Sequence, residues 1–282
     1  MTGMIAVVTD STAYLPPDDA VSREIRVVPL QVVIAGTAHD ETSFAGGDVL
    51  TALRQGKPAT TSRPAPERFA QVYARAAAAG APGIVSVHLS GSISGTVDSA
   101  RLAAVTAAVP TTVVDSRSIG AGLGFAALAA AAAAQAGCPL AEVAAAAARR
   151  SAHLRSVFCV TTLEHLRHGG RLGAAVLLSA PLGAKPLMHI VDGRIVPLEK
   201  VRTLARAVAR LEQLAAEFAV GRGAAQVDVV VQHLDCAERA AQLAQRLGAR
   251  ITGLRSLRII EVGPVIAAHT GPGLLGVAVA AD

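Results

Sequence analysis

Short apolar runs alternate with helical patterns in the first half of this chain, and this alternation restricts the fold more than any other feature. Four runs have the length and composition expected of buried strands: residues 5–8, 27–34, 84–89 and 111–114. The clearest helical pattern between them begins at Pro66 and stops at Gly80, and a second one extends from Val97 to Ala108. Strand–helix alternation predicts a parallel sheet with helices on both faces, so we expect an N-terminal α/β domain over residues 1–152.

The pattern changes after about residue 152. The segment MHIVDGRIVP predicts a β-hairpin with Asp192-Gly193 at its two-residue turn, and a long helix is predicted from Arg202 to about Phe218. A strand at 227–233, a helix at 237–247 and strands near 258–262 and 275–280 are predicted to follow. A hairpin followed by mixed strands and helices favours an α+β domain with a mixed or antiparallel sheet, which we place at residues 153–282.

Composition excludes several classes of protein. Hydrophobic residues make up 52% of the chain and charged residues 17%, which is not the composition of a disordered chain. The net charge is +5, but the basic residues are scattered and only 2% of residues are aromatic. A nucleic-acid binder gathers its charge on one face and stacks bases on aromatic rings, so we expect no nucleic-acid partner. A weakly basic surface instead favours acidic ligands or a transient contact with an anionic membrane surface.

The cysteines and the apolar segments indicate a cytoplasmic protein. Cys138, Cys159 and Cys236 are isolated, which argues against a disulfide framework and a zinc site and suits a reducing compartment. The first residues lack the basic start of a signal peptide. Residues 118–141 are uncharged, but they are mostly alanine and glycine, so we predict a buried helix from near Gly122 to Gly137 rather than a membrane span.

Small polar residues follow three of the predicted strands, at 9–12, 90–92 and 115–116. Ligands of parallel α/β sheets bind at this edge, outside the carboxyl ends of the strands. In VHLSGSISGTVDSA, Ser94 is the predicted N-cap of the next helix, with Gly95 beginning its first turn. Free backbone N–H groups there would suit a phosphate or a carboxylate. A plain capped helix explains the same residues equally well.

Motif tests give no catalytic residues and no metal ligands. A hydrolase elbow needs a central serine, but Ile93 stands at the centre of Gly91–Gly95, and the chain has no Walker A sequence. The GPGLLG segment at 271–276 precedes a predicted strand, unlike a dinucleotide-binding loop. His165 and His168 are expected to be surface residues of a short helix. The remaining polar elements, TTSRP, LSGSISGT, HGGRLG and AHTGPG, suit anion binding better than bond cleavage.

Six segments, in order along nearly the whole chain, resemble the DegV family of fatty-acid-binding proteins. They are VTDSTAYLP (8–16), TTSRPAP (60–66), LSGSISGT (89–96), LEHLRHGGRLG (163–173), AKPLMHIVDGRIVPLEKVRT (184–203) and EVGPVIAAHTGPGLLGVAV (261–279). The resemblance implies a two-domain α/β protein of the DegV type, called the EDD fold, with a long-chain fatty acid buried in an apolar tunnel between the domains. It implies no cofactor.

The resemblance also implies a partner and a set of ligand-binding residues. A separate fatty-acid kinase would phosphorylate the bound carboxylate with ATP, and the acyl phosphate would enter phospholipid synthesis; this chain would be a carrier and not an enzyme. Matched residue by residue, the head-group site would comprise Thr61, Ser62, Ser94, Gly95, Arg171, His269 and Thr270. Arg202 would contact the kinase.

Two other classes of function stay open from the residues alone. A stand-alone acyl hydrolase or transferase would require His269 or His189 within hydrogen-bond reach of Ser94 or Ser90, with a third, acidic group to orient the imidazole. A lipid-free anion-sensing module would have a shallow polar cleft and no apolar tunnel.

Overall fold

The computed structural model describes residues 3–43, 46–172, 185–221 and 226–281. Two compact units divide the chain: one contains residues 1–31 and 62–152, and the other contains residues 32–61 and 153–282. We call them the N-terminal and the C-terminal unit. Gly173 and Ala184, which belong to two of the matched segments, lie outside the described residues.

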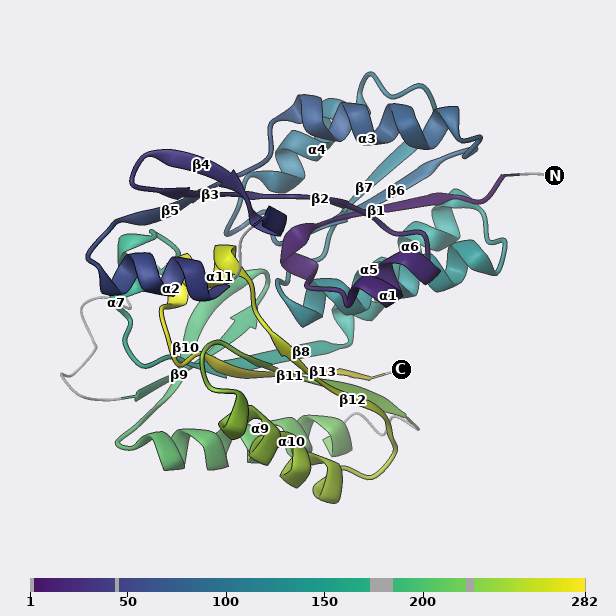
Figure 1. Ribbon diagram of the computed structural model, residues 1–282. Helices are drawn as coiled ribbons and strands as arrows, with labels where there is room; N and C mark the ends of the chain where they lie inside the picture. The colour runs from purple at the N-terminus through teal and green to yellow at the C-terminus, as the bar shows by residue number, and fades with distance from the viewer. Residues whose placement is uncertain (1–2, 44–45, 173–184, 222–225, 282) are drawn as a thin grey trace. The chain divides into compact units, whose positions relative to one another are not determined.

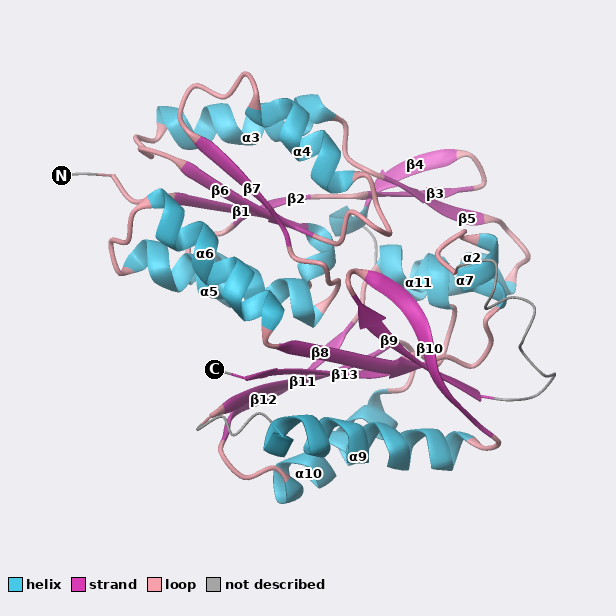
Figure 2. Cartoon of the chain, turned by 180° about the vertical axis from the view of Figure 1, so that it is seen from behind, coloured by secondary structure: helices cyan, strands magenta, loops and turns pink. Residues whose placement is uncertain are grey.

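A four-stranded parallel sheet forms the N-terminal unit, in the order β2-β1-β6-β7 (Figure 1). Its strands are β1 (Ala6–Asp10), β2 (Arg26–Val28), β6 (Ile84–His88) and β7 (Thr111–Asp115). Its helices are η1 (Ser11–Ala13), α1 (Pro17–Ser22), α3 (Pro66–Ala78), α4 (Thr96–Ala104), α5 (Ala121–Gln135) and α6 (Leu140–Ala152). The pair α3 and α4 covers one face of the sheet, and the pair α5 and α6 covers the other, as the α/β prediction required (Figure 2).

The uncharged stretch is a buried helix, as predicted. α5 begins after Gly120 and ends before Gly137, and most of its residues are buried. Small side chains allow close packing, because a Cβ atom at Gly124 would lie 2.9 Å from the carbonyl oxygen of Ala13. Within the described residues, no helix is both long enough and apolar enough to cross a bilayer.

The apolar run at 27–34 is not one strand, and that prediction was wrong. Pro29 lacks the N–H that a sheet ladder needs, so β2 ends at Val28 and a new strand, β3, begins at Gln31. β3 (Gln31–Ile34) lies between β4 (Thr37–Asp40) and β5 (Ala59–Ser62) in a separate three-stranded sheet. The 3-10 turn η2 (Glu41–Ser43) and helix α2 (Gly46–Arg54) connect β4 to β5.

Residues 32–61 group with the C-terminal unit, which differs from the predicted assignment of residues 1–152 to one domain. The buried Glu41 carboxylate accepts the Val265 N–H at 2.9 Å, and Arg54 pairs with Asp235 at 2.5 Å. These contacts join residues that are far apart in sequence, and no local pattern encodes them.

A six-stranded mixed sheet forms the centre of the C-terminal unit, in the order β10-β9-β8-β13-β11-β12. Its strands are β8 (Leu154–Cys159), β9 (Lys185–Val191), β10 (Arg194–Val201), β11 (Val227–His233), β12 (Leu254–Glu261) and β13 (Leu275–Ala281), and its helices are α7 (Glu164–His168), α9 (Leu204–Gly221), α10 (Ala237–Arg250) and α11 (Pro264–Thr270). β11 and β12 are parallel, whereas the other neighbours are antiparallel. α9 and α10 pack on one face (Figure 1).

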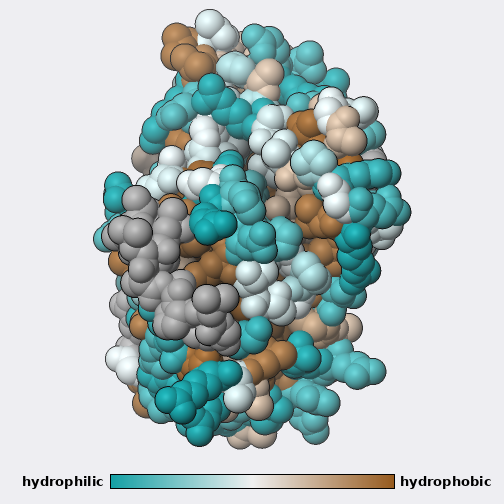
Figure 3. Space-filling model, turned by 90° about the vertical axis from the view of Figure 1, so that its left-hand side faces the viewer, coloured by the Kyte–Doolittle hydropathy of each residue, from teal (hydrophilic) through white to brown (hydrophobic). Residues whose placement is uncertain are grey.

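The predicted hairpin is present. β9 and β10 pair antiparallel around Asp192 and Gly193, whose φ angles of 48° and 79° are those of a primed two-residue turn. On the face drawn in Figure 3, hydrophilic and hydrophobic side chains are intermixed. The exposed large apolar residues are likewise dispersed along the chain: Val21, Val27, Leu102, Val105, Val191, Val220 and Ile259.

Candidate functional site

The structure places the predicted site residues on both units. In the C-terminal unit, Thr61 lies on β5, Arg171 follows α7, and His269 and Thr270 end α11. In the N-terminal unit, Ser62 is the last residue of β5, and Ser94 and Gly95 immediately precede α4. Arg202 is exposed, two residues before α9 begins.

Thr61 and His269 are in direct contact, although 208 residues separate them in sequence. Thr61 Oγ1 and His269 Nε2 form a hydrogen bond of 2.8 Å. Burial, together with the positive charge of Arg171, lowers the pKa of His269 to about 4. The imidazole is therefore neutral at physiological pH, and one of its nitrogens carries a hydrogen while the other accepts one.

Arg171 supplies the positive charge of this cluster. Its guanidinium donates to the carbonyl oxygen of Gly169, and burial lowers the pKa of the guanidinium. An arginine keeps its charge even when its pKa falls, because its ordinary value is so high. The cluster of Thr61, Arg171 and His269 thus combines one cation with a hydroxyl and a neutral imidazole, which suits a singly charged anion.

Glycines allow the two loops of this cluster to meet closely. A Cβ atom at Gly169 would overlap with His269 Nδ1, and one at Gly271 would overlap with the ring of His165. Gly271 also has a φ of +65°, which side chains rarely adopt. His165, predicted as a surface residue, is therefore partly buried against the GPG loop, whereas His168 is exposed.

Two predicted ligands already use their hydroxyl protons within the protein. Thr270 is buried, and its Oγ1 donates to the Ile266 carbonyl oxygen at 2.9 Å. Ser62 Oγ donates to Gln31 Oε1 at 3.2 Å. These contacts stabilise the end of α11 and the junction of β5 with β3, respectively.

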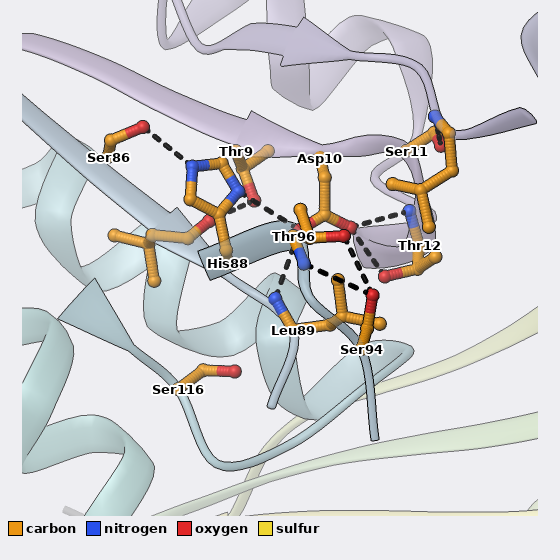
Figure 4. Close-up of polar contacts among 12 residues, drawn as sticks. Thr9, Asp10, Ser11, Thr12, Ser86, His88, Leu89, Ser94, Thr96 and Ser116 are labelled. Atoms are coloured by element: carbon orange, nitrogen blue, oxygen red, sulfur yellow. Dashed lines mark hydrogen bonds and ion pairs between the residues drawn. The ribbon is translucent and has the colours of Figure 1, made fainter. Parts of the chain in front are cut away.

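The loop before α4 differs from the prediction by one residue. Gly95, not Ser94, is the N-cap, because the turn from Ser90 continues through two backbone hydrogen bonds, from Ile93 and Ser94 to the Ser90 carbonyl. Ser94 Oγ lies 2.8 Å from Thr96 Oγ1 and accepts the Thr96 N–H at 3.3 Å (Figure 4). The hydroxyl of Ser94 thus still satisfies a helix N–H, although from the preceding position.

Arg63 packs over this helix start. Its Nη1 lies 3.5 Å from the Gly95 carbonyl oxygen, and a Cβ at Gly95 would overlap with the guanidinium.

The second predicted helix of the N-terminal unit, α4, ends at Ala104 and not at Ala108.

A buried polar network beneath the loop was not predicted from the sequence (Figure 4). The Asp10 carboxylate accepts the N–H and the hydroxyl of Thr12, at 3.1 and 2.5 Å, and the N–H of Leu89 at 3.0 Å. Its Oδ2 also accepts from His88 Nδ1 at 3.0 Å. Asp10 therefore joins the carboxyl ends of β1 and β6 at the point where the loop begins.

The network continues away from the loop. His88 Nε2 lies 2.6 Å from Ser86 Oγ, which accepts from the Tyr73 hydroxyl at 2.9 Å. Burial raises the pKa of Tyr73 to about 12, so the phenol keeps its proton and donates it. Ser86 is fully buried and thus closed to substrate, so this serine–histidine–aspartate chain is structural. Polar residues at alternate positions of an apolar strand, Ser86 and His88, were the available signal.

The hydrogen-bonded partner of the His269 imidazole is the hydroxyl of Thr61. Among the described residues, no three His, Cys, Asp or Glu side chains are placed to share a metal ion.

The sequence is similar to that of a known protein family and of several relatives. Residues 4–282 match the family described as "Uncharacterised protein, DegV family". A DegV domain-containing protein of Streptomyces coelicolor is 50% identical over 281 residues, which are 99% of each chain. One of Mycobacterium tuberculosis is 35% identical over 277 residues, which are 98% of this chain and 96% of the relative.

Solved structures share the fold over the full length. A DegV family protein of Thermus thermophilus, described as binding fatty acid, is 33% identical with a TM-score of 0.93, covering 99% of this chain and 100% of the other. DegV of Bacillus subtilis, described as a fatty-acid-binding protein, is 30% identical with a TM-score of 0.90 and the same coverage. The chain belongs to the DegV family.

Proposed function

We propose that the chain binds a long-chain fatty acid and holds its carboxylate at Thr61, His269 and Arg171. The observation that carries the proposal is the 2.8 Å contact between Thr61 and His269 beside the partly buried Arg171. The fatty-acid binding described for the Thermus and Bacillus relatives supports it.

The chemistry of the cluster suits a fatty-acid carboxylate. A buried carboxylate needs hydrogen-bond donors, because an unpaired buried polar group costs about 1–3 kcal/mol. The Thr61 hydroxyl and the neutral His269 provide donors without a second fixed charge, and Arg171 balances the negative charge. The affinity would come mainly from the tail, at about 0.8 kcal/mol for each buried CH2 group in an apolar tunnel.

The other predicted ligands differ in how well they are suited to hold the carboxylate. Ser94 and Gly95, at the start of α4, keep their predicted role in holding the carboxylate, supported by the resemblance of LSGSISGT to the family. Ser62 and Thr270 are less suited to donate, because their hydroxyl protons already bond to Gln31 and Ile266.

In this proposal the chain is a carrier and not an enzyme. A separate, cytoplasmic fatty-acid kinase transfers the γ-phosphoryl group of ATP to the bound carboxylate, which releases ADP and gives an acyl phosphate for phospholipid synthesis. Arg202 is exposed and is proposed to contact the kinase. This chain needs no cofactor in the proposal, since ATP would bind to the kinase.

The deciding experiment is mass spectrometry of the protein purified from cells, under native and then denaturing conditions. We expect a bound acyl chain whose mass gives its length and saturation. Absence of any lipid, together with no uptake of added oleate, would contradict the proposal and favour an anion-sensing module. Turnover of acyl esters by the purified chain alone would favour the hydrolase.

A further inference from the structure

A pocket lies in the C-terminal unit, at the carboxyl ends of two parallel strands. His233 ends β11 and Glu261 ends β12, and the two residues are register partners. α10 connects these strands, so its amino end lies at the same edge. The pocket has a volume of about 580 Å³, and His233, Asp235, Cys236, Glu238, Arg239 and Glu261 are among its lining residues. Ligands of parallel strand–helix–strand arrangements bind at this edge.

His233, a lining residue of this pocket, has an unmet hydrogen-bonding group. The residue is 6% exposed, and its Nδ1 is buried without a hydrogen-bond partner. An unpaired buried polar atom is destabilising, so a ligand group that reached Nδ1 would bind more tightly. The amino end of α10 is also uncapped by a side chain: Cys236 is its N-cap residue, and the thiol donates to the Leu274 carbonyl oxygen at 3.3 Å instead.

Side chains of opposite charge line the pocket. Arg239, in the first turn of α10, lies close to Cys236: burial raises the pKa of that thiol, and the guanidinium opposes the shift. Glu261 accepts the Asp235 N–H at 3.3 Å, whereas the Asp235 carboxylate is paired with Arg54 at 2.5 Å. The pocket lining therefore includes a cation at the amino end of α10 and the carboxylate of Glu261.

We propose that this pocket binds a small zwitterion of the amino-acid type, whose carboxylate meets Arg239 and the amino end of α10 and whose ammonium group meets Glu261. A ligand with only negative charge would be repelled by Glu238 and Glu261. A ligand with only positive charge would make no favourable contact with Arg239 or with the amino end of α10. The inference is independent of the proposed fatty-acid binding, which involves other residues.

The first test identifies the charge pattern of the ligand. Saturation-transfer NMR on the full chain with a mixture of the standard amino acids is expected to give signals from one or a few of them. Isothermal titration then compares the strongest binder with its N-acetyl and its carboxamide derivative. We expect each derivative to bind at least about tenfold more weakly, equivalent to about 1.4 kcal/mol. Absence of binding by every amino acid, or binding of both derivatives as tight as that of the unmodified amino acid, would overturn the proposal.

The second test locates the site. Arg239→Gln and Glu261→Gln are each expected to weaken amino-acid binding by about tenfold. His233→Phe is expected to weaken it too without lowering the thermal midpoint, because the phenyl ring fills the same space and removes an unpaired atom. The control is Arg246→Gln, an exposed arginine of α10 that pairs with Glu212. Unchanged binding in both charge variants would overturn the site.

Folding and fatty-acid binding are measured on the same preparations. Circular dichroism checks that each variant is folded. If a variant is not folded, the titration of the unaltered chain with the N-acetyl and carboxamide derivatives still tests the proposal. Fatty-acid affinity is expected to stay unchanged in every variant, which separates failure of this inference from failure of the proposed function.

Discussion

At the scale of single residues, His269 shows how burial sets the chemistry of the candidate site. Its pKa is lowered to about 4 because burial disfavours the charged imidazole and because Arg171 is nearby. A neutral imidazole accepts or donates beside an anion without a fixed ion pair. A protonated one would lie against Arg171 and lose part of its hydration.

The stability of the protein is therefore expected to depend on pH through His269. An unfolded histidine has a pKa of about 6.5, so the unfolded chain binds the proton first as the pH falls. The stabilisation is complete above pH 6.5 and is lost between there and about pH 4. Urea titrations should show a fall of at most about 3 kcal/mol in the free energy of unfolding that His269→Asn lacks. The exposed His168→Asn is the control and should retain the fall.

Gly169 is a second residue on which the site depends. We expect Gly169→Ala to displace His269, because the added Cβ would overlap with Nδ1, and to break the hydrogen bond to Thr61. Fatty-acid affinity measured by fluorescence displacement should fall, with a loss of about 1–3 kcal/mol of stability. Gly47→Ala, where a Cβ meets open space, should leave both unchanged or slightly improve stability. An unaltered affinity in Gly169→Ala would contradict the role of this contact.

At the scale of elements, Asp10 fixes two strand ends to each other. The carboxylate accepts hydrogen bonds from Thr12, His88 and Leu89, and these bonds hold the end of β1 against the start of the Ser90–Gly95 loop. Because the Asp10 carboxylate is fully buried, each of these hydrogen bonds forms at low dielectric, where it is stronger than in water.

Asp10→Asn places an amide N–H where backbone N–H groups already point. We expect the free energy of unfolding, measured by urea titration, to fall by about 3 kcal/mol. The matched control is Asp98→Asn on α4, which loses only an exposed pair with Arg101 at 3.3 Å and should cost less than about 1 kcal/mol. Equal effects of the two substitutions would show that the network does not hold the strand ends.

At the scale of the whole molecule, the proposed carrier function separates ligand binding from kinase docking. The carboxylate-binding residues proposed here are partly or fully buried, whereas Arg202 is exposed and lies outside a helix. A charge on a docking surface affects association with a partner more than it affects a distant ligand.

We expect Arg202→Ala to bind fatty acid with unchanged affinity but to lower kcat/KM for acyl-phosphate formation by the added kinase about tenfold. The control is Arg206→Ala, an exposed arginine in the first turn of α9, which should have little effect. A loss of fatty-acid affinity in Arg202→Ala would place this residue in the ligand site instead.

The sequence alone predicted the features that depend on neighbouring residues. The turn at Asp192-Gly193, the α3 boundaries at Pro66 and Gly80, and the buried α5 all follow from local conformational preferences and periodicity. The six family-like segments predicted the fold class. The break at Pro29 was visible in the sequence too, but the apolar run around it masked the signal.

Only the tertiary structure decided which distant side chains meet. The contact between Thr61 and His269, the grouping of residues 32–61 with the C-terminal unit, and the Asp10–His88–Ser86 chain join positions separated by tens to hundreds of residues. Local patterns report propensity and burial, but a long-range polar contact forms when packing removes both partners from water together. The sequence therefore supplied the groups of the site, and the packing of the chain selected which of them act on one another.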